Sequence, residues 1–578
     1  MARFGKTNID FGRLMCYDVC KGGGDMDVLI LALNSKYIHS SLAPWYLQSA
    51  IRDLAVDSLV LEHTINEKCE DILADVLVHK PKIFALSVYI WNVKMAYVLA
   101  KQIKVSLPTT KIIFGGPEVG YNPEEVLTKC PSVDYVIGGE GEEPFLALCK
   151  HLLLRDVCGW KGISRRYEKK IFVSEPYIGT GTPKSPYTDR YFHALQGRIA
   201  YFESSRGCPY SCAYCLSGRC EGMRFFDMTY VKENLLKLAA CGTKTVKFVD
   251  RTFNADRRRA LEILVFIASE SGRSFPADVS FHFELSGDLI DDEMIRFMQT
   301  VPPGLFQFEI GIQSFYPDTI RAIHRKTDSE TLKRRIRQLV AVGNAHIHTD
   351  LIAGLPYEGY EDFKNSFDVA YALGADMLQL GFLKILHGTE LEMRAGEYGL
   401  VFADTPPYAV HETPWLSRND FEKLKIVETA VDRLHNSGRF RRTLALCISR
   451  FPRAFDFFAE AGVAICDQKS LDALTDSLYH FLCEQLPDMA EEIRDVMVCD
   501  RLATNSSKTL PRSLYRADPD ILSVRKHLNA DTKTAEKSQV RRSIALLYHS
   551  RQAVYVDYVH KNHRGEHMLN LISLEKIK

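Results

Sequence analysis

The chain has 578 residues, which is too long for one hydrophobic core, so several domains are expected. Lys plus Arg equals Asp plus Glu at 73 each, so the net charge gives no specific signal for nucleic acid or a membrane as a partner. The longest apolar runs, such as residues 28–33, are far shorter than the roughly 20 residues that a membrane-spanning helix needs.

Residues 1–25 lack the apolar core and the cleavage site of a secretory signal, so an unstructured leader is predicted. Strand-like sequence begins directly after Met26, which leaves both Met1 and Met26 as candidate translation starts. Fifteen cysteines without an export signal indicate a reducing compartment, so a cytoplasmic location is expected. Most of them are scattered singly and are interpreted as small buried hydrophobic residues.

Residues 26–155 alternate short β-rich runs with amphipathic stretches, the pattern of a parallel sheet with crossover helices. Helices are expected over 42–54 and 93–103. The predicted strands are 28–33, 58–63, 83–88, 111–114 and 135–137. This pattern predicts an α/β domain with a doubly wound, flavodoxin- or Rossmann-like sheet.

In a doubly wound sheet, ligands bind beyond the carboxyl ends of the strands. Paired glycines at these ends let a large ligand approach the backbone, because no Cβ is in the way, although turn formation alone explains any single pair. The candidate binding residues at these ends are Asn34, Ser35, Ser87, Tyr89, Trp91, Gly115, Gly116, Pro117, Glu118, Gly138, Gly139, Glu140, Gly141 and Glu142. No Gly-x-Gly-x-x-Gly follows the first strand, which argues against a nicotinamide cofactor.

The Gly-Gly-Pro-Glu run at 115–118 and the Gly-Glu-Gly-Glu run at 139–142 resemble the cobalamin-binding domain of B12-dependent radical enzymes. The resemblance implies that both loops surround a corrin.

The sequence departs from one motif of corrinoid proteins. Those that ligate cobalt through histidine use Asp-x-His-x-x-Gly after the first strand, whereas here Tyr37 and Leu42 replace the Asp and the Gly around His39. Cobalamin without a protein nitrogen ligand is therefore expected. Tyr89 and Trp91 are candidates to cover its lower face, and a plain core role is the alternative for this pair.

A second motif follows the strand predicted at 199–202, on a loop that holds Cys208, Cys212 and Cys215. Three thiolates can bind three irons of one cubane and leave the fourth iron open. Zinc would need a fourth protein ligand, and the spacing of Cys220 from Cys215 does not complete a zinc knuckle. The Cys-x3-Cys-x2-Cys spacing resembles the radical S-adenosylmethionine superfamily. That resemblance implies a [4Fe-4S] cluster whose open iron binds S-adenosylmethionine.

Strand and helix pairs continue over residues 198–412 and predict a partial (β/α)6 barrel. Its predicted strands are 199–202, 245–249, 279–284, 305–312, 347–352 and 377–382. Residues 309–314 and 350–356 look like the branch that includes anaerobic coproporphyrinogen oxidase and the cobalamin-dependent methyltransferases. By that resemblance, the S-adenosylmethionine contacts are Glu284, Gln313, Arg325 and Asp350, with Asp250 as a further cofactor-binding candidate; each residue also has a structural alternative.

Two segments carry no chemical motif. Residues 156–197 are predicted to link the two cofactor domains, and residues 413–578 to form a mainly helical accessory domain. A β-hairpin is expected near its end, over 543–558 with 568–574. By elimination, this C-terminal domain is expected to cap the open barrel and select the substrate.

The two motifs together predict a cobalamin-dependent radical S-adenosylmethionine enzyme. The leading hypothesis is methylation of an unactivated carbon of an unknown substrate, through a 5'-deoxyadenosyl radical and methylcobalamin. A radical rearrangement or cyclisation with the same cofactors is the alternative, and a non-catalytic corrinoid- or metal-binding protein is a remote one. An external one-electron reductant such as a flavodoxin or ferredoxin is the expected partner.

Overall fold

The computed structural model describes residues 25–195, 197–219, 222–506, 509–530 and 541–576. The leader predicted at 1–25 lies outside the described residues except for Asp25, and Cys220 lies outside them as well. The chain divides into two units, Met1–Tyr201 and Phe202–Lys578. Among the helices of the described residues, none is long and apolar enough to cross a membrane.

The first unit is built on one sheet with the strand order β2-β1-β3-β4-β5-β6-β7. The five predicted parallel strands are confirmed: β1 (Val28–Asn34), β2 (Ser58–Thr64), β3 (Ile83–Ser87), β4 (Lys111–Gly115) and β5 (Tyr135–Ile137). Two antiparallel strands extend the sheet, β6 (Ile163–Tyr167) and β7 (Lys170–Phe172), so part of the predicted linker belongs to this sheet.

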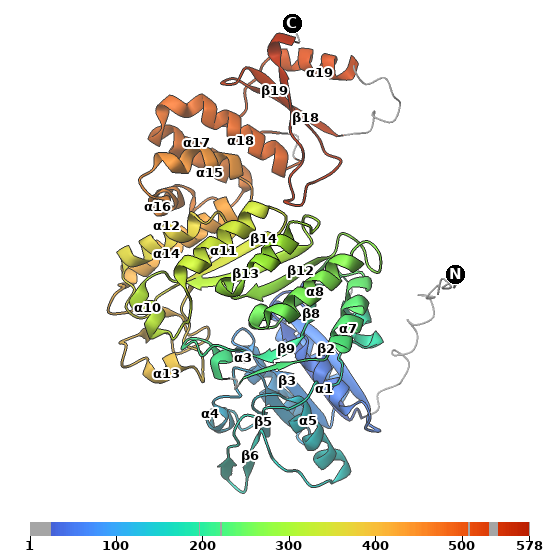
Figure 1. Ribbon diagram of the computed structural model, residues 1–578. Helices are drawn as coiled ribbons and strands as arrows, with labels where there is room; N and C mark the ends of the chain where they lie inside the picture. Colours follow the sequence, from blue (N-terminus) through green and yellow to red (C-terminus); the bar gives the residue numbers. More distant parts are fainter. Residues whose placement is uncertain (1–24, 196, 220–221, 507–508, 531–540, 577–578) are drawn as a thin grey trace, which may run out of the picture. The chain divides into compact units, whose positions relative to one another are not determined.

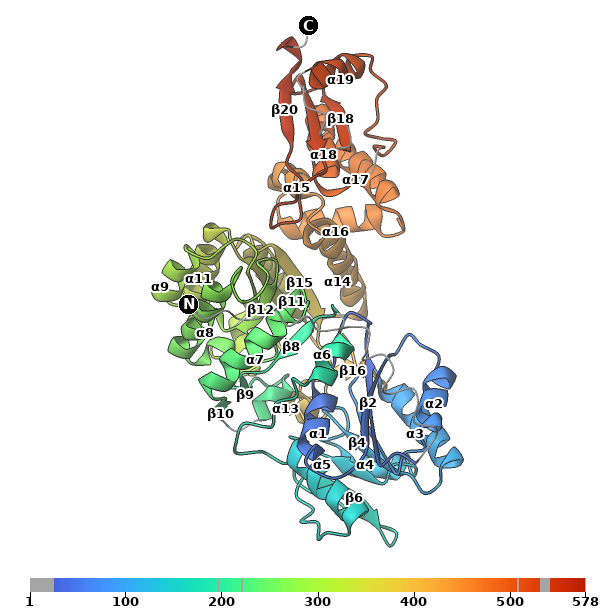
Figure 2. The ribbon, with the colours of Figure 1, turned by 90° about the vertical axis from the view of Figure 1, so that its right-hand side faces the viewer.

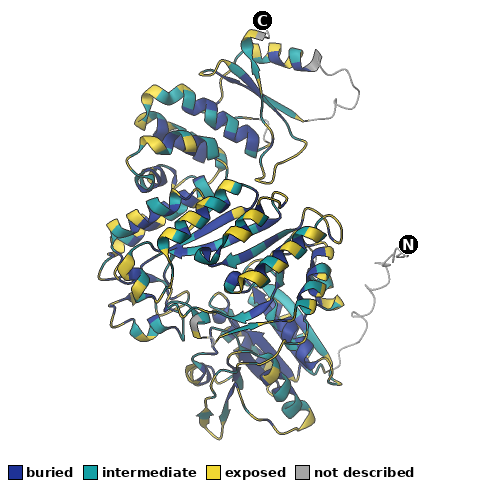
Figure 3. Ribbon diagram, in the orientation of Figure 1, coloured by how far each residue is buried: buried dark blue, intermediate teal, exposed yellow. Residues whose placement is uncertain are grey.

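Helices cover both faces of this sheet, as the continuous burial of β1 and β3 requires. One face packs on α2 (Cys69–Val78), α3 (Val93–Ser106) and α4 (Pro123–Lys129) in a single apolar cluster. The helices α1 (Ala43–Ile51) and α5 (Glu142–Cys149) lie on the opposite side (Figure 2). The interior strand β1 is therefore buried along its whole length (Figure 3).

The second unit contains the strands from β11 to β15 of the predicted six-stranded sheet, whose order is β15-β14-β13-β12-β11-β8. The strand β8 ends at Phe202, the first residue of that unit. The strands from β11 to β15 are parallel. Their bounds are β8 (Ala200–Phe202), β11 (Thr245–Phe248), β12 (Ser280–Leu285), β13 (Phe306–Gln313), β14 (His346–Ala353) and β15 (Met377–Phe382). In β13, fully buried residues alternate with half-buried ones, because one face lies under helices and the other lines the barrel lumen.

The helices of the barrel begin at aspartate caps that the sequence supplies. Asp227, Asp256 and Asp328 each accept hydrogen bonds from backbone N–H groups in the first turn of the helix that follows. Those helices are α7 (Met228–Ala240), α8 (Arg257–Glu270) and α11 (Ser329–Val342), and Figure 1 shows them along the outer face of the strands. The helices α9 (Asp292–Met298), α10 (Pro317–Ala322) and α12 (Tyr360–Tyr371) complete the set.

The C-terminal part of this unit is mainly helical, as predicted. Its helices are α14 (Arg418–Ala430), α15 (Arg441–Cys447), α16 (Ala454–Ile465), α17 (Leu471–Gln485), α18 (Ala490–Thr504) and α19 (Asp520–Ala530). The expected pairing of 543–558 with 568–574 is that of β19 (Gln552–Asp557) with β20 (Asn570–Ser573). The stretch 543–558 itself folds into two strands, because β18 (Arg542–Leu547) also pairs with β19. The buried carboxylate of Asp495 accepts three backbone N–H groups at the hairpin turn.

The start of this tail lies at the carboxyl end of the barrel, where Phe421 packs against Gly354. Phe455 in α16 contacts Tyr360 at the start of α12, with ring centroids 5.7 Å apart. The chain then reaches the amino end of β15, where Asn436 exchanges two hydrogen bonds of 2.9 Å with the backbone of Leu378. Arg441 pairs with Asp376 at the same end, at 3.3 Å. The tail therefore contacts both ends of the barrel, and the expected cap stays a prediction.

Candidate functional site

The first candidate site lies at one edge of the first sheet. Because β3, β4 and β5 are parallel and adjacent, their last residues align, with Ser87 opposite Gly115 and Gly115 opposite Ile137. The predicted loops after these strands therefore start from one edge. The structure brings the candidate cofactor residues of the first domain together there, as a parallel sheet requires.

Two glycines of this edge are required by the protein backbone itself. Gly116 has a φ of +104°, and a Cβ on it would lie 2.5 Å from the carbonyl oxygen of Val88. Gly139 has a φ of +79°, and a Cβ there would clash with the carbonyl oxygen of Tyr177. The sequence reasoning attributed these glycines to ligand approach, whereas close backbone packing already explains both. Gly115 differs, since its nearest neighbour would be 3.6 Å away.

Tyr89 and Trp91 form a flat aromatic surface after β3. Their rings stack at 4.4 Å between centroids with an interplanar angle of 4°, and Trp91 is 45% exposed, so this pair is not plain core. The indole Nε1 of Trp91 donates to the Leu33 carbonyl at 3.1 Å. The buried Asn92, which the sequence analysis missed, donates to the Leu33 and Ser87 carbonyls and accepts from the Tyr89 N–H. The aromatic pair is thus held rigidly to the ends of β1 and β3.

A buried ion pair fixes the loop after β1. Glu62 and Arg198 have 8% and 7% exposed side chains and lie 2.9 Å apart. Asn34 and Trp45 both donate to the Glu62 carboxylate, at 3.0 and 2.8 Å. One side-chain amide hydrogen of Asn34 is therefore used in a hydrogen bond within the protein. The predicted cofactor contact of Asn34 would have to use its other amide hydrogen or its side-chain oxygen. The sequence pattern gave no signal for Arg198, which lies directly after the segment predicted as a linker, at the start of the predicted barrel segment.

His39, the imidazole after β1, is occupied within the same unit. Its Nδ1 lies 2.8 Å from the hydroxyl of Tyr201. The residue is half-buried at a bridge that joins it to Ile199. This arrangement supports the interpretation of His39 as a structural residue.

The second candidate site is the cysteine loop of the second unit. Cys208, Cys212 and Cys215 are all half-buried, free thiols. The peptide between the last two is anchored twice, since the Ala213 N–H donates to the Ile323 carbonyl and its carbonyl accepts from the Leu391 N–H, both at 3.0 Å. Leu391 belongs to α13 (Glu390–Arg394), which follows the barrel.

Three cysteine thiolates on one loop suit a cubane, in which each thiolate binds a different iron and the fourth iron stays open. A tetrahedral zinc ion would need a fourth protein ligand.

Arg325 is placed beside this loop. Its guanidinium donates to the Gly311 carbonyl and, at 3.3 Å, to the hydroxyl of Tyr214. Burial raises the pKa of the Cys212 thiol, and the positive charge of Arg325 acts in the opposite direction. The structure therefore joins the predicted S-adenosylmethionine contact Arg325 to the cysteine motif.

Gln313 shows the strain that binding sites often contain. It has a φ of +71°, and the register between β13 and β14 shifts between Gly311 and Gln313, which marks a β-bulge. Its side-chain Oε1 is buried and has no hydrogen-bond partner among the described residues. A buried acceptor at the carboxyl end of a barrel strand fits a ligand that brings a donor, such as an ammonium or a ribose hydroxyl.

Glu284 and Asp250 lie in different surroundings. Burial raises the pKa of Glu284 to about 7, with the charge of Arg251 opposing that rise, so this carboxyl can change protonation near neutral pH. Asp250 is 1% exposed, and its carboxylate accepts from the Ser204 N–H and from the hydroxyls of Ser204 and Ser205. Asp250 thus supports the strand that leads to the cysteine loop, and a direct cofactor contact stays a prediction.

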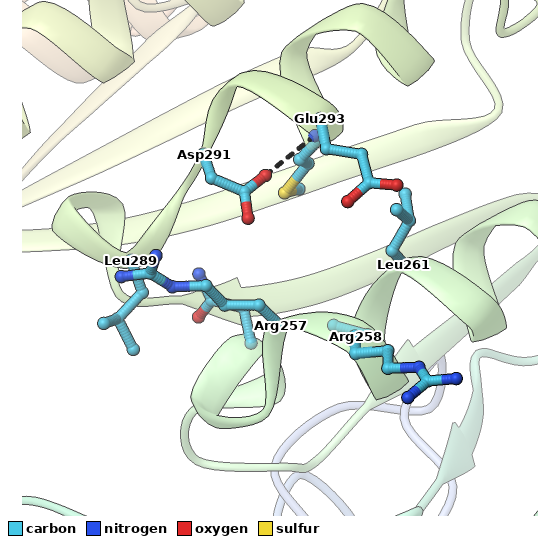
Figure 4. A pocket seen from close by; sticks show the side chains of 9 residues that line it. Arg257, Arg258, Leu261, Leu289, Asp291 and Glu293 are labelled. Atoms are coloured by element: carbon cyan, nitrogen blue, oxygen red, sulfur yellow. Dashed lines mark hydrogen bonds between the residues drawn. The ribbon is translucent and has the colours of Figure 1, made fainter.

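A separate small cavity of about 150 Å³ lies beside the starts of α8 and α9. Arg257 and Arg258 line it from one side, and Asp291 and Glu293 from the other (Figure 4). None of the predicted cofactor residues lines this cavity, and it is smaller than the roughly 300 Å³ at which small-molecule sites begin. The strand ends, and not this cavity, are therefore the candidate site.

Comparison with known families matches three segments of the chain. Residues 28–149 match the B12 binding domain, and residues 202–370 match the radical SAM superfamily. Residues 396–563 match a family described as a protein of unknown function, DUF4080. The first two matches cover the two candidate sites.

Two curated relatives are named as methyltransferases. The chain is 28% identical over 317 residues to the cobalamin-dependent radical SAM methyltransferase TokK of Streptomyces tokunonensis, covering 51% of this chain and 45% of that protein. It is 27% identical over 309 residues to the 2-(S-pantetheinyl)-carbapenam-3-carboxylate methyltransferase of Streptantibioticus cattleyicolor, covering 49% and 44%. The chain thus matches less than half the length of each.

The fold is also similar to a solved structure, that of the cobalamin-dependent S-adenosylmethionine radical enzyme OxsB with aqua-cobalamin and S-adenosylmethionine bound. The TM-score is 0.57 at 16% sequence identity, over 88% of this chain and 81% of that one. At this identity the likeness supports the fold.

Proposed function

We propose that this chain, which belongs to the radical SAM superfamily and carries a B12 binding domain, is a cobalamin-dependent radical SAM methyltransferase that acts on an unactivated carbon. The observation that carries the proposal is the presence of two sites in one chain, a three-cysteine loop at the head of a barrel and a rigid strand-end surface in a B12 binding domain. The two relatives named as methyltransferases favour methyl transfer.

The residues of the chain would bind and orient three cofactors. Cys208, Cys212 and Cys215 would hold a [4Fe-4S] cluster with one open iron, and the buried acceptor of Gln313 would take a donor of S-adenosylmethionine. The stacked rings of Tyr89 and Trp91 would exclude water from one face of the corrin. When bound, these groups supply a carbon-centred radical and a methyl carrier, chemistry that side chains alone cannot perform.

Two further inferences belong to this proposal. Reduction of the cluster needs an external one-electron donor such as a flavodoxin or ferredoxin. Cysteines that bind a cluster must not be oxidised to disulfides. This requirement is compatible with the cytoplasm, where thiols stay reduced.

The first experiment measures cofactor chemistry in anaerobically purified protein. With a reductant and cobalamin, cleavage of S-adenosylmethionine to 5'-deoxyadenosine is expected, and Cys212→Ala should abolish it together with the brown cluster chromophore. A colourless zinc protein without this cleavage would contradict the proposal.

The second experiment identifies the substrate. Small molecules and hydrolysed RNA from cells with and without the gene are compared by mass spectrometry, and the loss of the gene is expected to leave a species lighter by one CH2. Transfer of a labelled methyl group to that species then tests the reaction class. A product without the label would rule out methyl transfer.

A further inference from the structure

One charged side chain interrupts the apolar run of β2, and the proposed function gives it no role. Glu62 follows Leu61 directly, yet its side chain is only 8% exposed. A carboxylate that leaves water is costly unless an opposite charge and hydrogen bonds compensate it. The compensating charge is Arg198, whose side chain is 7% exposed and which follows 136 residues later in the chain. This pair therefore joins two distant segments of the first unit.

The carboxylate of Glu62 accepts three hydrogen bonds, and one of them comes from a candidate cofactor residue. Oε2 accepts from Arg198 at 2.9 Å and from Asn34 at 3.0 Å, and Oε1 accepts from the Trp45 indole at 2.8 Å. Compared with apolar side chains of the same volume, a buried ion pair adds little net stability. It does impose an orientation, because the amide nitrogen of Asn34 must face Glu62 and its side-chain oxygen must then point elsewhere.

The loop after β1, residues 35–41 and here called the β1 loop, depends on the same distant segment. It contains neither glycine nor proline, the residues that most strongly impose a turn. Instead, the Ile199 N–H donates to the Ile38 carbonyl at 2.9 Å, and the Ser40 hydroxyl donates to the Ile199 carbonyl at 2.8 Å. The β1 loop begins with the candidate cofactor residue Ser35, so Ile199 helps to set the conformation of a predicted cofactor loop.

Arg198 also donates to three backbone carbonyls. Its Nη1 donates to His39 in the β1 loop at 3.3 Å. Its Nη2 donates to Ala194 at 2.8 Å and its Nε to Leu195 at 3.3 Å, both in the last turn of α6 (Asp189–Leu195). A guanidinium holds its N–H donors in one rigid plane, which a lysine ammonium cannot reproduce. Arg198 thereby aligns the β1 loop, β2 and α6 with one another.

We propose that Glu62 and Arg198 are positioning residues of the cobalamin site, which hold Asn34 and the β1 loop where the cofactor binds. This role rests on the proposed function, because it takes the first domain to bind cobalamin. It also extends the site along the chain, since the match to the B12 binding domain ends at residue 149 and Arg198 lies beyond it. Cobalamin binding then depends on a segment that directly precedes the barrel.

The test measures the binding of aquacobalamin to the full chain, prepared without cobalamin, by equilibrium dialysis. Glu62→Gln and Arg198→Lys should each weaken binding by about tenfold or more, because each leaves buried polar groups without a partner. Asp27→Asn is the matched control. It disrupts the ion pair of Asp27 with Lys82, 2.7 Å apart at the opposite end of β1, and should bind cobalamin as the wild type does.

A double-mutant cycle separates positioning from a general loss of structure. If Glu62 acts through Asn34, then Asn34→Ala weakens cobalamin binding in the wild type but has little further effect in Glu62→Gln. A merely structural role of Glu62 would leave the two effects additive. Equal effects of Asn34→Ala in both backgrounds would therefore overturn the proposal.

The EPR spectrum of bound cob(II)alamin, recorded at saturating cobalamin, supplies a readout that does not depend on affinity. The indole of Trp91, which would exclude water from the corrin, is held by the Leu33 carbonyl directly before Asn34. A displaced end of β1 should therefore change the axial environment of cobalt in Glu62→Gln, while Asp27→Asn gives the wild-type spectrum. An unchanged affinity or an unchanged spectrum in both folded variants, Glu62→Gln and Arg198→Lys, would overturn the proposal.

Far-UV circular dichroism establishes that each variant is folded. Should Glu62→Gln and Arg198→Lys not fold, Trp45→Phe carries the test, because it keeps an aromatic ring and removes only the donor to Glu62 Oε1. The failure of this role and the failure of the proposed function can be distinguished. Wild-type protein that binds no cobalamin would contradict the proposed function. Wild-type protein that binds one cobalamin per chain, with variants that match it, would contradict only the positioning role.

Discussion

After the first strand, His39 is the imidazole near the position from which a histidine would ligate cobalt. In the structure, this imidazole instead contacts another side chain of the protein. Because its Nδ1 lies 2.8 Å from the Tyr201 hydroxyl, we expect His39→Ala to leave the cobalt coordination unchanged. The measurement is the EPR spectrum of bound cob(II)alamin, in which an axial nitrogen splits the cobalt lines. A splitting that is present in the wild type and lost in His39→Ala would show that His39 is a cobalt ligand after all.

The adjacent glycines 115 and 116 provide a matched pair of substitutions. Gly116→Ala forces a Cβ to 2.5 Å from the Val88 carbonyl at a positive φ, so we expect it to destabilise the cobalamin-free protein by roughly 1–3 kcal/mol. Gly115→Ala has room in the protein and should leave the unfolding temperature nearly unchanged, while a corrin over this loop would reveal it as weaker cobalamin binding. Equal unfolding temperatures for the two variants would contradict the packing argument.

Some of the candidate site residues could be predicted from the sequence alone. The three cysteines were predicted from their spacing, and the loop glycines were predicted from their occurrence in runs. Gln313 was chosen by resemblance, but its positive φ and its buried Oε1 result from the bulge between β13 and β14, which no local pattern encodes.

At the scale of elements, Glu358 joins the turn after β14 to two neighbours. Its Oε1 accepts from Ser314, just after β13, at 2.6 Å and from Ser366, in α12, at 2.8 Å. The side chain is 0% exposed. Burial raises the pKa of Glu358 to about 7, although the two serine hydrogen bonds act in the opposite direction. Within the fold, this carboxyl therefore favours its protonated form.

The raised pKa of Glu358 predicts a pH dependence of stability. The folded chain holds the proton more tightly than the unfolded chain, so the contribution is fully present below pH about 4.5 and is lost as the pH rises toward 7. Between pH 5.5 and 7 the loss is about 2 kcal/mol. Calorimetry should show a larger decrease in unfolding temperature over this range for the wild type than for Glu358→Gln, whose amide does not ionise. Equal decreases would mean that the carboxyl titrates normally.

The strands were the most predictable elements, because buried strands of a parallel sheet are short apolar runs between turn residues. All five parallel strands of the first sheet and all six of the barrel were found in this way. The strands β6 and β7 were missed, since their basic and aromatic residues at the sheet edge resemble a linker. The pairing of β6 with β5 depends on contacts distant in sequence, which composition does not report.

At the scale of the whole molecule, the segment after β15 lies beside the cysteine loop. The sequence analysis did not predict this position. Residues 383–412 contain α13, and this helix contacts the cysteine loop through the Leu391 N–H. The later tail instead meets the amino end of β15 through Asn436 and Arg441. Barrel chemistry takes place at the carboxyl end. We therefore infer that the 383–412 segment and the start of α14 contribute to substrate selection.

The division into two units predicts how the molecule unfolds. Because residues 1–201 and 202–578 form separate units and the predicted cobalamin loops lie in the first, calorimetry should show two transitions. Cobalamin at about 100 times its dissociation constant adds about 2.7 kcal/mol to the unit that binds it, or a rise of roughly 5–10 °C in that transition alone. Gly116→Ala should lower the same transition, and Glu358→Gln should affect the other. A single cooperative transition, or a cobalamin shift in both, would mean that the two units unfold as one.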